Sequence, residues 1–392
     1  MTVLKWLGRM ALAALLAAVV VGVWKREELV RLWAVQTLFN EDRIVANFSN
    51  MDAAFLTRDV ARGDGPVSPL PMGPQLTMPE GFGGWLEERA ITSVVVLKDG
   101  ARVFEDYYKG TGPDDRRISW SIAKSYLSAL FGTVVAEGLI DLDAPVTQYA
   151  PALAGGAYDG ATVLDVLQME SGITFNEDYL DQSSDINRMG RIIALGGEMD
   201  GFAAGLTETF AAPGEQWKYT SIDTHVVGMV IRGATGQDIA SLMSERIMTP
   251  LGLEQTPYYL TDGVGTAFVL GGLNLTSRDY ARFGQMILQD GAWDGQQIVP
   301  ADWIEASILP SAKTQEGKIG YGYQWWIPVG AEPGDEVLGR GIYGQYLYLD
   351  RSSGVVIVVT AADRQFRDAG AHAQNIEMLR QITARVEAMS GT

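Results

Sequence analysis

The sequence contains no cysteine and only two histidines, His225 and His372. The lack of cysteine excludes disulfide bonds, a cysteine nucleophile and thiolate metal sites. Two histidines are too few for a zinc site built from several imidazoles, and they leave few candidates for a Ser-His-Asp triad. A Gly-x-Ser-x-Gly elbow is also absent. If a serine is the nucleophile here, we expect its base to be a residue other than histidine, and we expect no cofactor and no metal ion.

Basic charge is scarce as well. Lysine and arginine number 30 against 48 acidic residues, which gives a formal net charge of −18. Nucleic-acid partners require clustered Lys and Arg, so we expect no nucleic acid to bind. Hydrophobic residues make up 47% of the 392 residues, enough for a sizeable core in one large domain or two ordinary ones.

One long apolar run is present, at Met10–Trp24, with basic residues on both sides. It fits either a signal-peptide core or a short membrane anchor, and a buried helix is a further alternative. The run ends in Val-Gly-Val-Trp, without the small residues of a cleavage site. We therefore favour an uncleaved anchor, with Trp6 and Trp24 at the membrane interfaces. Basic flanks on both sides leave its orientation undecided.

Three regions follow from this pattern. Residues 1–26 form the hydrophobic anchor, residues 27–80 a helical segment and a connector, and residues 81–392 the main domain. Within the second region, Glu27–Phe39 is expected to be an amphipathic helix. Prolines and glycines interleave between Gly63 and Gly84, which indicates an extended connector without packing of its own.

In the main domain, strand patterns lie at both ends and helical patterns lie between them. A hairpin is expected at Ile91–Lys109, around the turn pair Asp99-Gly100. The other expected strands are Tyr321–Val329, Gln345–Leu349 and Val355–Thr360. The expected helices are Tyr126–Gly138, Thr162–Glu170, Phe202–Phe210, Val226–Arg232, Ser277–Leu288 and Asn375–Met389, with a polar loop at Gly172–Asn187. This order predicts an α+β fold, in which an antiparallel sheet from N- and C-terminal strands packs with helices beside a helical subdomain.

The chemistry-bearing stretch is Ser119-Trp-Ser-Ile-Ala-Lys-Ser125. Ser121 and Lys124 are three residues apart, so in a helix they share a face, one turn apart. Ser121 falls in the expected first turn, where unpaired backbone N–H groups and the helix dipole favour developing negative charge. A serine beside a lysine there is a plausible activated nucleophile. The alternative is a helix N-cap serine with a solvated lysine.

Two further motifs follow at sensible spacing. They are Tyr219-Thr-Ser221, and Gly339-Arg-Gly341 at the opening of a C-terminal strand. With Ser121-x-x-Lys124, this array resembles the three-part signature of the serine β-lactamase and penicillin-binding-protein superfamily. Its Tyr-x-Ser form resembles the branch of class C β-lactamases, esterases and 6-aminohexanoate-dimer hydrolases. Further stretches similar to the last group are Asn176-Glu-Asp-Tyr179, Gln324-Trp-Trp326 and Gly341-Ile-Tyr-Gly-Gln345.

The resemblance implies roles for individual residues. Ser121 would be acylated, Lys124 would be its base or proton relay, and Tyr219 would protonate the leaving group and later activate water. Ser221 would hydrogen-bond within this network. The backbone N–H groups of Ser121 and Ile342 would form the oxyanion hole. Gly341 and Tyr179 would lie along the substrate.

Each of these residues also has a purely structural interpretation. Tyr219 could be a half-buried core tyrosine, Ser221 a helix N-cap, and Tyr179 a loop packing residue. His225, close to an apolar helix, is expected to be structural.

The pattern departs from the family at two places. Gly339 stands where penicillin-recognising enzymes have a lysine that helps bind a carboxylate, and Arg340 follows it. Gly190 and Leu270 align with an acidic residue and an asparagine of the hydrolases that act well on nylon oligomers. A broad esterase or amidase is therefore the expectation.

Three hypotheses remain open. The first is a serine hydrolase of small esters or amides, anchored by the N-terminal helix with its catalytic domain outside the cytoplasmic membrane. The second is a β-lactamase or D,D-peptidase. The third is an inactive binding module with the same fold.

Overall fold

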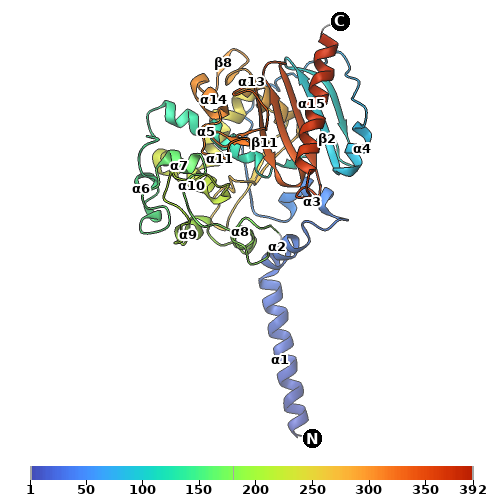
Figure 1. Cartoon of the computed structure of the whole chain (residues 1–392). Helices are drawn as coiled ribbons and strands as arrows, with labels where there is room; N and C mark the ends of the chain where they lie inside the picture. The colour runs from blue at the N-terminus through green and yellow to red at the C-terminus, as the bar shows by residue number, and fades with distance from the viewer. Residues whose placement is uncertain (1, 180, 391–392) are drawn as a thin grey trace.

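The computed structural model describes residues 2–179 and 181–390. A globular body carries one long helix, α1 (Thr2–Trp24), which projects from it, and the C-terminal end lies on the opposite side of the body (Figure 1). The body combines antiparallel sheets with helices, so the predicted α+β class is confirmed.

The main sheet has seven strands in the order β3-β2-β13-β12-β11-β10-β9, and all its pairs are antiparallel. It therefore joins N- and C-terminal strands, as the sequence predicted. Its strands are β2 (Ile91–Lys98), β3 (Ala101–Tyr107), β9 (Gly320–Tyr321), β10 (Trp326–Ile327), β11 (Glu336–Gly341), β12 (Gln345–Asp350) and β13 (Val355–Ala361).

Two strand predictions near the C-terminus need correction. The stretch Tyr321–Val329 is not one strand but two short ones, β9 and β10, paired with each other. Gln324 between them has a φ of 65°, in the left-handed region, and this turns the chain back on itself. Gly339-Arg-Gly341 ends strand β11 and does not open a strand.

Successive side chains of a strand point to opposite faces of the main sheet, and each face packs against a different hydrophobic core. Val94 and Val96 pack under helices α4 (Phe82–Glu88) and α15 (Ala371–Ser390). Val95 and Leu97 face the larger core, which includes α5 (Ile122–Ala136) and α13 (Ser277–Leu288). Helix α5 contacts β11, so the start of α5 lies beside the β11 end of the sheet.

The helical region lies beside this core. Helix α9 (Met199–Ala204) begins and ends earlier than the predicted Phe202–Phe210, and the predicted loop Gly172–Asn187 already contains the start of α8 (Asp185–Leu195), capped by Ser184. The remaining helices are α6 (Val146–Tyr149), α7 (Val163–Leu167), α10 (Ser221–Thr235), α11 (Ile239–Met243), α12 (Thr249–Leu251) and α14 (Ala301–Ile308). A second sheet has strands β1 (Thr57–Asp59), β5 (Tyr258–Leu260), β6 (Leu273–Leu275) and β4 (Arg117–Ile118), and a small hairpin has β7 (Ala292–Trp293) and β8 (Gln296–Gln297).

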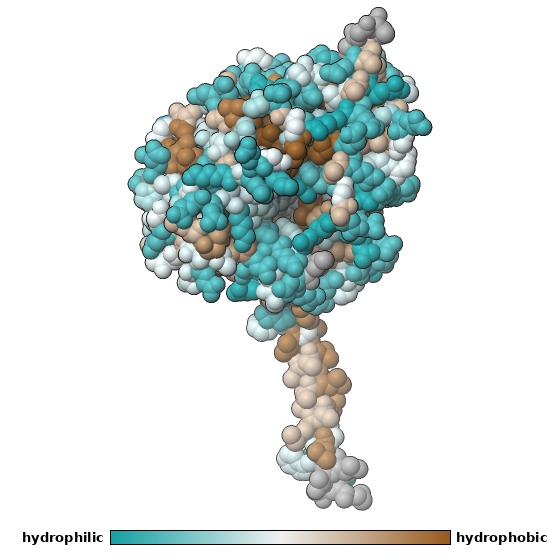
Figure 2. All heavy atoms as spheres, viewed as in Figure 1, coloured by the Kyte–Doolittle hydropathy of each residue, from teal (hydrophilic) through white to brown (hydrophobic). Residues whose placement is uncertain are grey.

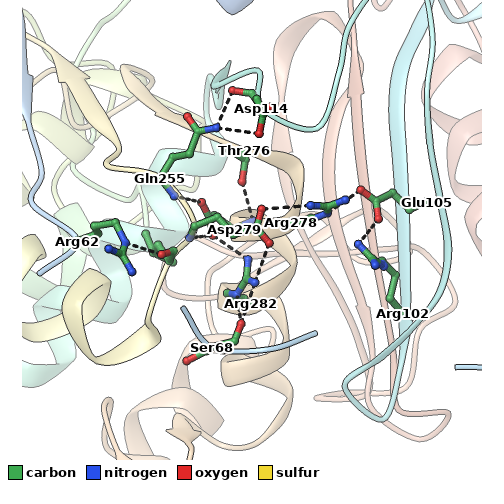
Figure 3. A network of polar contacts seen from close by, with 12 residues as sticks. Arg62, Ser68, Arg102, Glu105, Asp114, Gln255, Thr276, Arg278, Asp279 and Arg282 are labelled. Atoms are coloured by element: carbon green, nitrogen blue, oxygen red, sulfur yellow. Dashed lines mark hydrogen bonds and ion pairs between the residues drawn. The ribbon is translucent and has the colours of Figure 1, made fainter. Parts of the chain in front are cut away.

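The region 27–80 is packed against the body. Helix α2 (Arg26–Thr37) contacts α8, and Phe48 of α3 (Ile44–Ser49) is fully buried in the main core. The proline- and glycine-rich stretch is extended, as expected, but it is not free of contacts. Ser68 accepts hydrogen bonds from Arg282 on α13, within a network that runs on through Arg278 to Glu105 on β3 (Figure 3). The division of the chain at residue 80 stays a prediction.

Helix α1 differs from the body in its surface. Residues Lys5–Trp24 have a mean hydropathy of 2.0 and none of this helix is buried. Figure 2 shows it as a largely apolar stem below a mostly hydrophilic body. Its length and composition suffice to cross a membrane, a property that an N-terminal signal sequence shares.

Candidate active site

Ser121 lies at the N-terminal end of α5, beside strand β11 of the main sheet. It occupies the N-cap position of that helix, yet its hydroxyl makes no capping hydrogen bond. The preceding residue, Trp120, has a φ of 43°, an unfavourable conformation for a bulky side chain. The structure therefore leaves the Ser121 hydroxyl available for chemistry, and the interpretation as a simple cap does not hold.

Lys124 lies one turn further along α5 and is 1% exposed, so it is not a solvated surface lysine. Its Nζ is 3.1 Å from Ser121 Oγ and donates a hydrogen bond of 2.7 Å to the carbonyl oxygen of Leu270. Burial lowers the pKa of Lys124 to about 7, while the negative charge of Glu177 acts in the opposite direction. Near neutral pH a substantial fraction of the amine is therefore uncharged and able to accept a proton.

Tyr219 reaches the same point from the segment before α10. The Lys124 nitrogen lies 5.4 Å from the centroid of the Tyr219 ring. Burial and then the charge of Glu177 raise the pKa of Tyr219, while hydrogen bonds with Ser121 and Ser221 act in the opposite direction. The phenol is thus protonated at neutral pH, and it lines the same pocket as Ser121.

The candidate oxyanion hole lies where β11 ends. Among the described residues, neither the backbone N–H of Ser121 nor that of Ile342 has a hydrogen-bond partner. A Cβ on Gly341 would lie 2.6 Å from the carbonyl oxygen of Ser119, so only glycine allows β11 to approach the start of α5 this closely. These two free donors can hold a developing negative charge.

Glu177 also belongs to the site, although the sequence did not predict this. Its carboxylate accepts hydrogen bonds from the backbone N–H of Ser221, from the Ser221 hydroxyl at 3.3 Å and from the Tyr179 hydroxyl at 2.9 Å. Glu177 therefore joins Ser221 and Tyr179, which lie on different segments. It was visible only as part of the stretch Asn176-Glu-Asp-Tyr179.

The purely structural interpretations of Ser221, Tyr179 and His225 have different outcomes. Ser221 is the first residue of α10 and not its N-cap, which is Thr220. Tyr179 is partly buried against the main core and also lines the site pockets, so packing and substrate contact coexist in it. His225 is buried in α10 and bonds Asp200 at 2.8 Å, away from the nucleophile.

Two pockets meet at Ser121, and Tyr179 and Ile342 also belong to both. One pocket, termed the polar pocket, is marked by charged and polar side chains, and its lining includes Tyr219, Glu177, Trp326, Arg340, Arg367 and His372. The other is apolar, and no acidic or basic side chain of the described residues lines it. Ser121 therefore lies between a pocket with charged lining residues and a pocket without them.

The residues at which the sequence departs from the family pattern lie in these pockets. Arg340 lines the polar pocket, 5.7 Å from the ring centroid of Trp326. Gly190 and Leu270 line the apolar pocket. Among the described residues, no group of three or more His, Asp or Glu side chains is arranged to hold a metal ion.

Comparison with known proteins gives matches over most of the chain. The family model described as Beta-lactamase matches residues 86–379. The chain is 35% identical over 288 residues to a 6-aminohexanoate-dimer hydrolase of Paenarthrobacter ureafaciens, covering 70% of this chain and 73% of the relative. A β-lactamase of Pseudomonas fluorescens is 25% identical over 174 residues, 42% of this chain and 44% of its own.

Solved structures agree with these sequence matches. A putative 6-aminohexanoate-dimer hydrolase from Bacillus anthracis superposes with a TM-score of 0.79 at 25% identity, covering 90% of this chain and 96% of its own. A D-stereospecific amidohydrolase from Streptomyces sp. gives a TM-score of 0.57 at 20% identity over 73% of this chain and 96% of its own, which shows a shared fold. The resemblance read from the three motifs is confirmed.

Proposed function

This chain belongs to the beta-lactamase family and is a serine hydrolase, and we propose that it cleaves small ester or amide bonds through an acyl-enzyme on Ser121. The observation that carries the proposal is the meeting of a hydroxyl, a buried amine and a phenol. Lys124 Nζ lies 3.1 Å from Ser121 Oγ and 5.4 Å from the ring centroid of Tyr219, and Tyr219 and Ser121 line the same pocket. Together they supply a nucleophile, a base and an acid without histidine.

In the acylation step, neutral Lys124 accepts the proton of Ser121 as Oγ bonds to the substrate carbonyl carbon. The carbonyl oxygen becomes negative and receives hydrogen bonds from the N–H groups of Ser121 and Ile342. The tetrahedral intermediate then collapses and the bond to the leaving group breaks. Tyr219 gives its proton to the leaving alcohol or amine and recovers one from Lys124.

Deacylation runs through the same groups in reverse. A water molecule takes the place of the departed alcohol or amine, and Tyr219 with Lys124 accepts its proton. The hydroxide attacks the acyl carbon, the bond to Oγ breaks, and Ser121 regains its proton. Glu177 is a positioning residue in this scheme, because it fixes Ser221 and Tyr179 beside the reacting groups.

The alternative of a penicillin-recognising enzyme has weaker support. Gly339 offers no amine for a substrate carboxylate, and a Cβ added there would already lie 3.3 Å from Ser125 Oγ. Arg340 lines the polar pocket and could bind an anionic group by a different route. Acylation by labelled penicillin therefore separates the two functions, and we expect it to be slow or absent.

We also propose that α1 anchors the enzyme to a membrane. The support is its apolar length, the lack of buried residues within Lys5–Trp24 and the presence of Trp6 and Trp24 near its two ends. We further propose that the catalytic domain lies on the outer side of the cytoplasmic membrane, although the basic residues on both sides of the apolar run do not decide its orientation. Fractionation of cells expressing the full chain tests the membrane anchor, because salt and alkaline washes release peripheral proteins and leave a spanning helix in the membrane.

The direct test of the catalytic proposal is a panel of p-nitrophenyl esters and p-nitroanilides with the full chain. Full-length protein is needed because residues before the family match line the site. We expect hydrolysis that is lost in Ser121→Ala and strongly reduced in Lys124→Ala. Activity retained by both variants would contradict the mechanism.

A further inference from the structure

One wall of the apolar pocket comes from outside the family match. Helix α2, the two residues after it and the segment after α3 supply five apolar side chains, and all of them precede residue 86. These are Val35, Leu38, Phe39, Met51 and Phe55. The region for which the sequence suggested no function therefore builds part of the space beside the nucleophile.

The facing wall comes from α8, which packs directly on α2. Ile186, Met189 and Ile193 lie on one face of α8 at helical spacing and line the pocket. Phe268 and Leu270 close it near Lys124. A pocket lined by apolar side chains beside the proposed nucleophile favours binding of an apolar part of a substrate, because the removal of apolar surface from water is favourable.

The two pockets also give the direction in which a substrate lies. Tyr219, the proposed proton donor to the leaving group, lines the polar pocket and not the apolar one. The leaving alcohol or amine must lie beside its proton donor, and hence in the polar pocket. The acyl group then extends to the other side of Ser121, into the apolar pocket between α2 and α8.

We propose that the acyl group of the natural substrate is an apolar chain held between α2 and α8, with a polar leaving group on the side of Arg340. This inference rests on the proposed hydrolase function and adds the substrate class. Helix α2 follows α1 directly, and both lie at the same end of the body (Figure 1). If α1 crosses a membrane, the acyl pocket therefore lies at the end of the enzyme next to the bilayer.

Chain-length dependence tests the proposal. The full chain, held in phospholipid nanodiscs, is assayed with p-nitrophenyl acetate, butyrate, hexanoate and octanoate, each corrected for its uncatalysed hydrolysis. We expect kcat/KM to rise about fourfold for each added methylene until the pocket is filled. Longer esters also concentrate in the bilayer, so the decisive comparison is between variants in identical nanodiscs.

A larger side chain at position 190 would fill part of the apolar pocket, because Gly190 lines it. Gly190 lies in the middle of α8, and a Cβ added there meets no atom within 4 Å. Gly190→Leu should therefore preserve the helix and occupy the chain's space. We expect it to lower the octanoate-to-acetate ratio of kcat/KM at least tenfold. Val35→Trp, on the opposite wall, should lower the same ratio.

The matched control is Gly83→Leu in α4. This glycine is also helical with open space around it, but it is exposed on α4 and lines neither site pocket. Its ratio should equal that of the wild type. A ratio that neither pocket variant lowers, while acetate hydrolysis still depends on Ser121, would overturn the acyl-pocket inference alone. Absence of any Ser121-dependent hydrolysis would overturn the proposed function and the inference with it.

Discussion

The side-chain nitrogen of Lys124 lies 3.1 Å from the hydroxyl oxygen of Ser121, and both residues stand at the start of the same helix. The lysine is buried and hydrogen-bonded to the carbonyl of Leu270. An uncharged amine in that position can take the serine proton, whereas an ammonium cannot. The burial that makes this lysine costly to the fold therefore makes it useful as a base.

The first prediction concerns pH. Lys124 has a pKa lowered to about 7, and only its neutral form is a base. We expect kcat/KM to increase as pH rises through about 7 and then to level off, whereas an unperturbed lysine would place the midpoint near 10.4. A pH profile with a soluble ester measures it. A rate that is independent of pH between 5 and 9 would argue against Lys124 as the base.

A second prediction isolates Glu177. Its negative charge raises the pKa of Lys124, so Glu177→Gln should move the midpoint of the profile to lower pH. The same change weakens the hydrogen bonds to Ser221 and Tyr179, so the plateau rate should also fall. Glu87→Gln serves as the control, since Glu87 is an exposed glutamate that bonds Lys109 and lines neither site pocket. A midpoint unchanged in Glu177→Gln would show that its charge is not felt at the base.

The third prediction concerns Tyr219. Removing its hydroxyl in Tyr219→Phe leaves the ring packed on Trp326 at 4.9 Å, so the fold should be kept. Loss of the proton donor should lower kcat by about 10²- to 10⁴-fold. The loss should be larger for anilides than for p-nitrophenyl esters, because an amine leaving group needs a proton more than p-nitrophenolate does. Wild-type kcat for both substrates in Tyr219→Phe would mean that Tyr219 only packs.

The fourth prediction concerns Gly341. A Cβ there would lie 2.6 Å from Ser119 O and 3.0 Å from Gln345 Cβ, so Gly341→Ala must displace β11 where it positions the Ile342 N–H. We expect kcat to fall about 10²- to 10³-fold, the usual effect of losing one oxyanion donor. Gly339→Ala, with its closest contacts at 3.3 Å, should lose far less. Similar kcat values for the two variants would exclude this role for the end of β11.

A fifth prediction tests the packing that supports the nucleophile helix. A Cβ on Gly132 of α5 would lie 2.2 Å from the ring of Trp303 on α14. Gly132→Ala should therefore destabilise the protein by about 1–3 kcal/mol, measured by urea denaturation. Gly84→Ala in α4, where nothing lies within 4 Å, should instead be neutral or slightly stabilising. If the free energy of unfolding of Gly132→Ala equals that of Gly84→Ala, the contact between Gly132 and Trp303 does not hold α5 in place.

Periodic segments were predictable from the sequence. The helix expected at Ser277–Leu288 has those same bounds in α13, since its apolar period and the cap at Thr276 both act locally. Tyr321–Val329 was not predictable, because its aromatic residues favour a strand while the left-handed backbone at Gln324 breaks it. Tertiary packing determines the left-handed backbone conformation of Gln324, and no local sequence pattern predicts it.

The candidate site shows the same division. Ser121, Lys124 and Tyr219 belong to motifs that can be recognised in a single sequence. Glu177 does not, because a glutamate in a polar loop is usually solvated, and its contact with Ser221 spans 44 residues. The apolar pocket was equally hidden, since the facing helices α2 and α8 are far apart in the chain. Long-range packing creates such features, and composition and spacing do not report it.

Acylation of Ser121 tests the central claim most directly. The full chain and Ser121→Ala are treated with a fluorophosphonate probe, and intact-mass analysis with peptide mapping locates the adduct. We predict one adduct per wild-type molecule, on Ser121, and none on Ser121→Ala, with labelling that slows as pH falls below about 7 because the pKa of Lys124 is lowered to about 7. A folded wild-type protein that takes no label, or that takes it on another serine, would contradict the account.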